Sequence, residues 1–407
     1  MKKKRKKLKP FSVILIIIVL IFGISLYHHL RVKFAVKEVE LYTKGVQVFD
    51  DLKLSDLIKS INGELIDDPK IDTSKIGTQE IEFKYITDSH IKVPYTITIE
   101  VIDNIPPIVD YPGVKTVTVG TSKKELAKSL FCGDNYDDTP KCSITGDYNL
   151  NEPGEYRVAL QGKDSSGNIT KHSFTLVVKE KRKSNGNNNT SDDFEFTNYT
   201  SYSDIYKKHK NKKTEIGIDV SYWDGDIDYK KLKKSKVEFA YIRVGRRDDV
   251  AGKFILDEKF ERNIKGFNKV GIPVGVYFYS KANSREEAIK EAKWVLNQIK
   301  KYNVELEVVF DWENWNSYQY YNLSFYNLTE VAKAFTDTVS KKGYTGMVYS
   351  SKSYLEDVWF PIDSKVWLAH YTDQTNYQGK YKVWQICEDG RVKGIDDSLV
   401  DIDIRYK

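Results

Sequence analysis

From Ile216 to the C-terminus the sequence alternates apolar strand candidates with helical segments, and this alternation restricts the fold more than any other feature. Eight segments read as strands, at residues 216–222, 239–244, 273–279, 307–312, 346–350, 366–371, 381–386 and 399–404. Five read as helices, at residues 229–235, 257–270, 285–302, 324–342 and 353–358. A helix follows each of the first five strands but none of the last three. We therefore expect residues 214–407 to form an α/β barrel of modified TIM type, with five β/α units plus three strands.

The N-terminal segment joins a basic head at residues 1–10 to an apolar run at residues 11–30. The length of this run suits a transmembrane signal anchor or the core of a signal peptide, and no small-residue cleavage site follows it. We expect an uncleaved single-pass anchor in the cell membrane, with a cleaved signal peptide as the alternative. The positive-inside rule then places the N-terminus in the cytoplasm and the later domains outside the cell. Because the basic head adjoins this segment, we read it as an orientation signal and predict no nucleic-acid partner.

With 407 residues, the chain is too long for one ordinary domain. Residues 36–104 and 105–180 read as two copies of one β-rich unit, in which Gly77 and Gly154 mark equivalent turns. Each copy ends in a strand with period-two alternation, which is typical of an all-β sandwich. The two units resemble bacterial immunoglobulin-like domains in their Pro-Pro join, in the turn at 152–156 and in the segment at 164–168. The resemblance implies a spacer, with a ligand-binding module as the alternative.

Between these units and the barrel, residues 181–213 are rich in Lys, Asn, Ser and Thr and read as a flexible linker. Three cysteines are present. Cys132 and Cys142 flank a polar loop, so in an oxidising compartment they could form a disulfide, and two free thiols are the alternative. Cys387 lies in an apolar strand and reads as a core residue. No further Cys or His lies close in sequence to the first two, so no metal site is predicted.

Two carboxylates close the fourth strand of the expected barrel. Asp311 and Glu313 are two residues apart, and alternate residues of a strand point to the same face. Two like charges held side by side resist simultaneous ionisation, so the pKa of at least one should rise. A carboxylic acid that stays protonated near neutral pH is what glycosidic bond cleavage requires. The alternative is a strand end that is polar and exposed to solvent.

Further acidic and aromatic residues lie near the C-terminal ends of the other expected strands or on the last strand, where β/α barrels carry their reactive groups. We predict four catalytic carboxylates, namely Asp219, Asp311, Glu313 and Asp401. We predict six substrate-binding residues, namely Tyr277, Tyr349, Trp367, Tyr371, Trp384 and Asp403. Carboxylates with aromatic rings suit a carbohydrate, because rings stack on the apolar faces of sugars and carboxylates transfer protons. Each aromatic residue taken singly is more often part of a core.

Residues 214–407 resemble the glycoside hydrolase family 25 lysozymes, the N-acetylmuramidases that cut peptidoglycan. The matching motifs occur in the family's order, at residues 217–221, 227–229, 275–278, 310–313, 367–371, 384–385, 394–395 and 400–403. The resemblance implies that Glu313 protonates the leaving oxygen, that Asp311 raises the pKa of Glu313, and that Tyr277 lies near the reacting sugar. It also implies that Asp219 and Asp401 orient the sugar from the floor of the site. The nucleophile stays open, with attack by the substrate's own acetamido group as one possibility.

The sequence departs from the family pattern at Asp224, where Gln is common, at Arg243, where Lys is frequent, and at Asp403, where Asn is common. The four catalytic candidates are nevertheless present. The resulting prediction is a membrane-tethered lysozyme that hydrolyses the β-1,4 bond between N-acetylmuramic acid and N-acetylglucosamine in peptidoglycan. The alternatives are a surface scaffold that binds wall glycan without cutting it, and a hydrolase of another N-acetylated glycan. No phosphate-binding glycine loop or metal motif occurs, so no cofactor is predicted.

Overall fold

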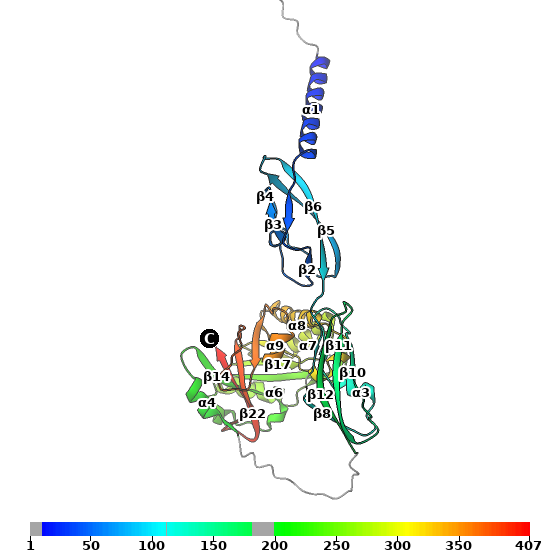
Figure 1. Cartoon of the computed structure of the whole chain (residues 1–407). Coiled ribbons are helices and arrows are strands. Elements are labelled where there is room, and N and C mark those ends of the chain that lie inside the picture. Colours follow the sequence, from blue (N-terminus) through cyan, green and yellow to red (C-terminus); the bar gives the residue numbers. More distant parts are fainter. Residues whose placement is uncertain (1–9, 111, 181–198) are drawn as a thin grey trace, which may run out of the picture. The chain divides into compact units, whose positions relative to one another are not determined.

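The computed structural model describes residues 10–110, 112–180 and 199–407, and it divides into two compact units, Met1–Asn104 and Ile105–Lys407 (Figure 1). Of the predicted segments, nearly all of the basic head and residues 181–198 of the linker lie outside the described residues. Each unit is described by itself.

The first unit begins with helix α1, which spans Pro10–Lys33. Its part from Ile14 to Lys33 is long and apolar enough, by length and composition, to cross a membrane. The large apolar side chains from Ile14 to Leu26 are all exposed, so no described protein surface covers them. The helix is somewhat longer at both ends than the predicted segment 11–30, since helical geometry continues through the flanking polar residues.

The rest of the first unit is a β-rich segment. Its elements are β1 (Val39–Leu41), β2 (Gly45–Gln47), α2 (Leu54–Leu57), β3 (Ile58–Ile61), β4 (Gly63–Leu65), β5 (Gly77–Thr87) and β6 (Lys92–Ile102). Four of the strands form a sheet in the order β2-β6-β5-β4, and β1 pairs with β3. Alternate residues of the long β5–β6 hairpin, among them Tyr85, Val93 and Ile99, are buried, which gives the period-two pattern.

The second unit opens with another β-rich segment. Its elements are β7 (Ile108–Val109), β8 (Val114–Thr118), α3 (Lys123–Lys128), β9 (Cys132–Gly133), β10 (Lys141–Thr145), β11 (Gly154–Lys163) and β12 (Ile169–Lys179). The sheet order is β8-β12-β11-β10, and β7 pairs with β9. This is the order of the first segment, with a parallel first pair in both cases, so the two β-rich segments share one topology.

Cys132 and Cys142 are joined in a disulfide. We expect the double substitution Cys132→Ser, Cys142→Ser to lower the free energy of unfolding by about 2–3 kcal/mol, because the bond closes a short loop in the unfolded chain. Chemical unfolding, followed for wild type and variant with and without reductant, measures this loss. Reductant should lower the stability of the wild type to that of the variant, and an effect of reductant on the variant itself would contradict the assignment.

The remainder of the second unit contains a closed ring of eight strands. They are β14 (Thr214–Val220), β15 (Ala240–Arg247), β17 (Val274–Tyr279), β18 (Val308–Asp311), β19 (Gly346–Ser351), β20 (Lys365–Ala369), β21 (Val383–Val392) and β22 (Ile395–Tyr406). Neighbours pair in this order and β22 pairs with both β21 and β14, which closes the ring. All pairs are parallel except the two made by β22. A short strand, β16 (Phe254–Leu256), pairs with β15 on the outside of this ring.

Five helices follow the first five strands of the ring and lie around it (Figure 1). They are α5 (Tyr229–Lys234), α6 (Phe260–Val270), α7 (Arg285–Ile299), α8 (Phe325–Ser340) and α9 (Lys352–Asp357). In residues 199–407 no helix follows the last three strands, as the sequence pattern predicted. One apolar cluster fills the space between strands and helices, and a second one, which includes Tyr241, Val309 and Trp367, fills the inside of the ring. Strand residues alternate between these two cores.

Two sequence predictions about this region need correction. Residues 199–213 are not linker, because they form β13 (Thr200–Ser201) and α4 (Tyr202–His209), with Tyr202 and Ile205 buried against the ring. The spacing of Ser284 and Glu287 predicts a capping box at the start of α7, but only half of this box forms. Ser284 accepts a hydrogen bond from the Glu287 N–H, but the Glu287 side chain pairs with Arg247 at 2.7 Å instead of returning to the cap.

Candidate functional site

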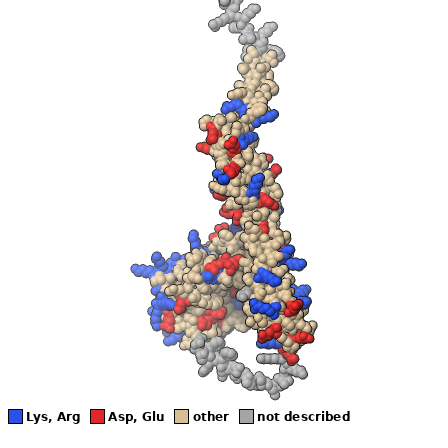
Figure 2. All heavy atoms as spheres, viewed as in Figure 1, with Lys and Arg blue, Asp and Glu red and all other residues tan. Residues whose placement is uncertain are grey.

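Acidic side chains from three strands gather at one end of the ring. Asp219 on β14 lies directly opposite Asp401 in the antiparallel ladder with β22, and Asp403 lies two residues further along β22, on the same face and opposite Gly217. Asp311 is the last residue of β18, and Glu313 follows two residues later. The outer surface, in contrast, mixes Lys and Arg with Asp and Glu over the face seen in Figure 2. The antiparallel direction of β22 brings its aspartates to the end where the parallel strands finish.

The pair at the end of β18 differs from the strand geometry predicted for it. The strand ends at Asp311, which is only 4% exposed, whereas Glu313 lies beyond the strand and faces a hollow open to solvent. Burial, together with the negative charge of Glu313, raises the pKa of Asp311 well above its usual range. Burial also raises the pKa of Glu313, while the hydrogen bond from Asp311 lowers it. Burial thus favours the protonated form of both carboxyls, whereas the hydrogen bond from Asp311 favours the Glu313 anion.

The aspartates of β14 and β22 form the second part of the acidic group. Burial and then the charges of Asp401 and Asp403 raise the pKa of Asp219 well above its usual range. Burial and the charge of Asp401 do the same for Asp403. Burial, followed by the charges of Asp224 and Glu388, raises the pKa of Asp401 to about 7. This group therefore holds protons at neutral pH that ordinary aspartates would have lost.

These raised pKa values predict that the folded chain loses stability as the pH rises through this group's titration range. The unfolded chain ionises Asp401 above its ordinary pKa of 3.8, whereas the folded chain resists ionisation up to about pH 7, so the folded state is penalised increasingly over that window. We expect Asp401→Asn to raise the thermal unfolding midpoint at pH 8 more than at pH 4. Asp204→Asn, on the exposed face of α4, serves as the control and should give no such difference. Equal midpoint changes at both pH values for Asp401→Asn would contradict the prediction.

Gln385 connects the acidic group to two tyrosines. Its amide nitrogen donates to Asp219 Oδ2 at 2.9 Å, and its amide oxygen accepts from the Tyr349 hydroxyl at 2.8 Å and the Tyr371 hydroxyl at 3.1 Å. The sequence prediction chose the neighbouring Trp384 instead. Trp384 is 3% exposed and lies in the outer core, with its indole N–H donated to the His370 carbonyl. The alternation of side chains along β21 therefore turns the amide, not the indole, toward the carboxylates.

The other predicted aromatic residues lie on the inner side of the ring. Trp367 is buried and donates its indole N–H to Asp403 Oδ1 at 2.8 Å. The Tyr277 ring packs edge to face against the Trp367 ring, with 6.1 Å between the ring centres. Burial, then the charge of Asp219, raises the pKa of Tyr277 well above its usual range. Tyr371 is 49% exposed, which leaves its ring free to contact a ligand. Trp367 and Tyr277 thus lie against the carboxylates inside the ring, whereas Tyr349 and Tyr371 lie at the end of the ring that opens to solvent.

A hollow of about 580 Å³ opens beside the acidic group. Glu313 and Tyr349 line it, together with Trp315, Lys352, Ser353, Tyr354, Glu356, Asp357, Ser351 and the residues at 369–371. A second hollow of about 360 Å³ shares Tyr371 with the first and contains Glu388. The sequence prediction missed Glu388, although its charge raises the pKa of both Glu313 and Asp401. Glu388 is exposed and lies on β21 beyond the residues that pair with β20. An exposed glutamate at such a place has no sequence pattern that marks it as part of a site.

The family departures at Asp224 and Arg243 have structural explanations. Asp224 accepts a hydrogen bond from the Ser221 N–H at 2.7 Å and caps the short turn after β14, and burial raises its pKa to about 6. Arg243 pairs with Asp257 at 2.8 Å and lies 5.0 Å from the centre of the Tyr222 ring. Its positive charge lowers the pKa of Asp311, which partly offsets the effect of burial.

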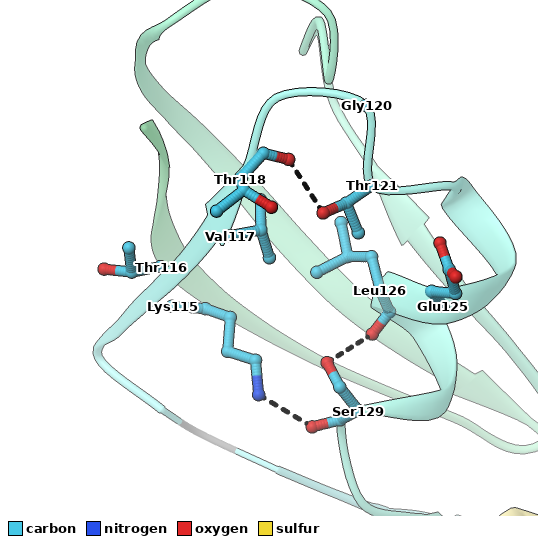
Figure 3. Close-up of a pocket in the computed structure, with 9 residues that line it drawn as sticks. All are labelled: Lys115, Thr116, Val117, Thr118, Gly120, Thr121, Glu125, Leu126 and Ser129. Atoms are coloured by element: carbon cyan, nitrogen blue, oxygen red, sulfur yellow. Dashed lines mark hydrogen bonds between the residues drawn. The ribbon is translucent and has the colours of Figure 1, made fainter. Parts of the chain in front are cut away.

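A third hollow, of about 550 Å³, lies on the second β-rich segment between β8 and α3 (Figure 3). Lys115 donates to the Ser129 carbonyl at 2.8 Å, Thr121 to the Thr118 carbonyl at 2.7 Å, and the Ser129 hydroxyl to the Leu126 carbonyl at 2.9 Å. These polar groups already have partners within the segment. The hollow contains no aromatic ring and does not resemble the acidic one in chemistry.

The buried carboxylates of Asp134 and Asp164 lie in the same segment. Their oxygens are within 4.8 Å of each other, which is close enough for both to bind one cation. Asp134 accepts from the N–H groups of Tyr136 and Asp137, and Asp164 accepts from the N–H and the side chain of Asn168. These hydrogen bonds hold the two carboxylates in their loops.

Comparison with known proteins matches residues 218–395 to the family described as glycosyl hydrolases family 25. The autolytic lysozyme of Clostridium acetobutylicum is 25% identical over 190 residues, which are 46% of this chain and 54% of that protein. Lysozyme M1 of Streptomyces globisporus is 32% identical over 68 residues, which are 17% of this chain and 21% of that protein. A solved family 25 glycosyl hydrolase from Bacillus anthracis is 21% identical, with 49% of this chain and 92% of that chain covered and a TM-score of 0.41. The chain thus spans about half the length of the autolytic lysozyme, and its residues 218–395 match the model of the glycosyl hydrolases family 25.

Proposed function

We propose that the domain is a lysozyme that hydrolyses the β-1,4 bond between N-acetylmuramic acid and N-acetylglucosamine in peptidoglycan. The observation that supports this most is the buried acidic group with raised pKa values, together with Glu313, which lines a hollow of a size for sugar rings. The family match and the relatives named as lysozymes favour the same reaction.

In the proposed reaction Glu313 is the general acid. It faces the hollow and keeps its proton through burial, so it can donate that proton to the leaving oxygen as the glycosidic bond breaks. Asp311 then stabilises the Glu313 anion through the hydrogen bond that it donates. Asp219, held by Gln385, and Asp401 orient the sugar. A water molecule then gives its hydroxyl to the anomeric carbon and its proton to the Glu313 anion, which restores the acid.

We also propose that α1 anchors the chain in the cell membrane, with the later domains outside the cell. The exposed apolar side chains of Ile14–Lys33 support this, because lipid would cover them, and the lysines before residue 10 favour a cytoplasmic N-terminus. In this proposal the ring of strands is a TIM-type barrel that lacks three helices, and the two β-rich segments are immunoglobulin-like spacers that give it reach. Tethering would confine cleavage to the envelope of the same cell.

Mass spectrometry of glycan fragments tests the proposed reaction. The full-length chain, purified in detergent, is incubated with purified peptidoglycan, and fragments with N-acetylmuramic acid at the reducing end are expected. Fragments with N-acetylglucosamine at that end would contradict the proposed bond. Binding to peptidoglycan without any fragment release would show a glycan-binding scaffold instead, and release from chitin alone would show a different substrate.

A further inference from the structure

The second β-rich segment places one aromatic side chain outside its own core. Phe131 is 7% exposed, yet it belongs to the apolar cluster that surrounds the ring of strands. The centre of its ring lies 5.2 Å from that of Tyr318, 5.8 Å from that of Tyr354 and 6.2 Å from that of Phe325, the last in a stacked arrangement. Aromatic pairs at these separations attract each other beyond the area that they bury. Phe131 therefore acts as a core residue of the neighbouring domain.

A glycine makes this close approach possible. A Cβ atom at Gly133 would lie 2.4 Å from the Phe325 ring and 2.8 Å from the Tyr318 ring. Any other residue would push the β-rich segment away from these two rings. The backbone is equally close, since the Phe325 N–H donates to the Asp134 carbonyl at 2.7 Å.

Polar contacts fix the same segment of the ring domain. Asp138 Oδ1 accepts from the Ser324 N–H at 2.6 Å and from the Asn327 side chain at 2.7 Å, at the start of α8. The Gln319 side chain donates to the Leu130 carbonyl at 2.8 Å. Residues more than 180 positions apart are thereby held together, and the contacts named here fall on the ring side between positions 315 and 327, apart from Tyr354.

That segment begins beside the proposed general acid. The short helix η2 (Trp315–Tyr320) begins two residues after Glu313. The Trp315 ring stacks on the Tyr354 ring, with 3.8 Å between the ring centres and 15° between the ring planes. Glu313, Trp315 and Tyr354 all line the hollow of about 580 Å³. Phe131 contacts both stacked rings, at 6.3 Å and 5.8 Å, from the side of the β-rich segment.

We propose that the second β-rich segment is a working part of the substrate cleft, in which Phe131 and Asp138 are positioning residues that hold the stacked Trp315–Tyr354 pair in place to bind the glycan strand. The inference rests on the proposed hydrolysis of an N-acetylated glycan and extends it to a segment that is otherwise a spacer. Rings set at the border of a cleft bind sugars well only when their orientation is fixed in advance, so the segment sets the affinity of the cleft rather than the chemistry of Glu313.

Steady-state kinetics of the full-length chain in detergent, on solubilised peptidoglycan strands, tests this inference. We expect Asp138→Ala to raise KM by about tenfold and to change kcat by less than about twofold, because the charge-assisted hydrogen bonds between Asp138 and the start of α8 are lost. Asp138→Asn keeps an acceptor oxygen and should return KM to within about threefold of wild type. Phe131→Ala should also raise KM selectively. Asp137→Ala is the matched control, because Asp137 bonds only Ser165 and its own loop in the described contacts, and it should leave both constants unchanged.

The outcomes separate this inference from the proposed function. Wild-type chain that releases no fragments would overturn both. Active wild type with unchanged KM in Asp138→Ala and Phe131→Ala would overturn the inference alone. A fall in kcat at constant KM, in proportion to a lower unfolding temperature, would also overturn it, because loosened folding reduces the number of active molecules without changing the cleft.

Discussion

Glu313→Gln is expected to lower kcat for peptidoglycan cleavage by about three orders of magnitude, the loss typical of a missing general acid. Glutamine has nearly the same shape as glutamic acid but no proton to donate to the leaving oxygen. Glu313 faces the hollow from beyond the end of β18, so the substitution leaves the buried core untouched. Release of reducing sugar ends measures the loss.

The variant should still bind peptidoglycan, because the aromatic border of the hollow remains. Glu258→Gln, an exposed substitution before α6, is the control and should retain wild-type activity. If Glu313→Gln cleaves at the wild-type rate, another residue donates the proton, and the assignment of Glu313 is wrong.

Asp311→Asn is expected to lower kcat by about two orders of magnitude and to move the alkaline limit of activity to higher pH. The hydrogen bond from Asp311 lowers the pKa of Glu313, because it stabilises the Glu313 anion that forms when the leaving oxygen is protonated. Asparagine is a weaker hydrogen-bond donor than a carboxylic acid, so the variant stabilises that anion less and Glu313 keeps its proton to higher pH. A profile of kcat between about pH 4 and pH 9 measures both effects.

The double variant Asp311→Asn, Glu313→Gln should be no slower than Glu313→Gln alone, since the two residues act as one unit. Losses that multiply in the double variant would show that Asp311 acts independently of the proton on Glu313. An unchanged alkaline limit in Asp311→Asn would show that the hydrogen bond from Asp311 does not set the pKa of Glu313.

The strands of the ring could be predicted from the sequence because they are buried on both faces. Such strands are continuous apolar runs with polar flanks, and the run at 273–279 predicts β17 to within one residue. The acidic residues were found for the same reason, since a carboxylate that ends or interrupts such a run has few structural uses. Predicted and observed strand starts differ by up to four residues, where turns and bulges rather than composition set the ends.

The exact partners within the site could not be predicted. Trp384 and Gln385 are neighbours on one strand, and their facing depends on the register of β21, which no composition signal reports. Helix α4 was read as linker because its surface is rich in lysine, and only two buried residues, Tyr202 and Ile205, hold it in place. The role of Phe131 as a support of the cleft could not be predicted, because its partners all lie more than 180 positions later in the chain.

Strand β22 brings two of the aspartates and closes the ring against β14. These two are the first and the last strands of the ring in sequence, so their pairing is the most distant contact that the ring requires. A folding chain therefore has no finished cleft until β14 and β22 have paired. A substitution that weakens this pairing would remove activity even where every side chain of the site is intact.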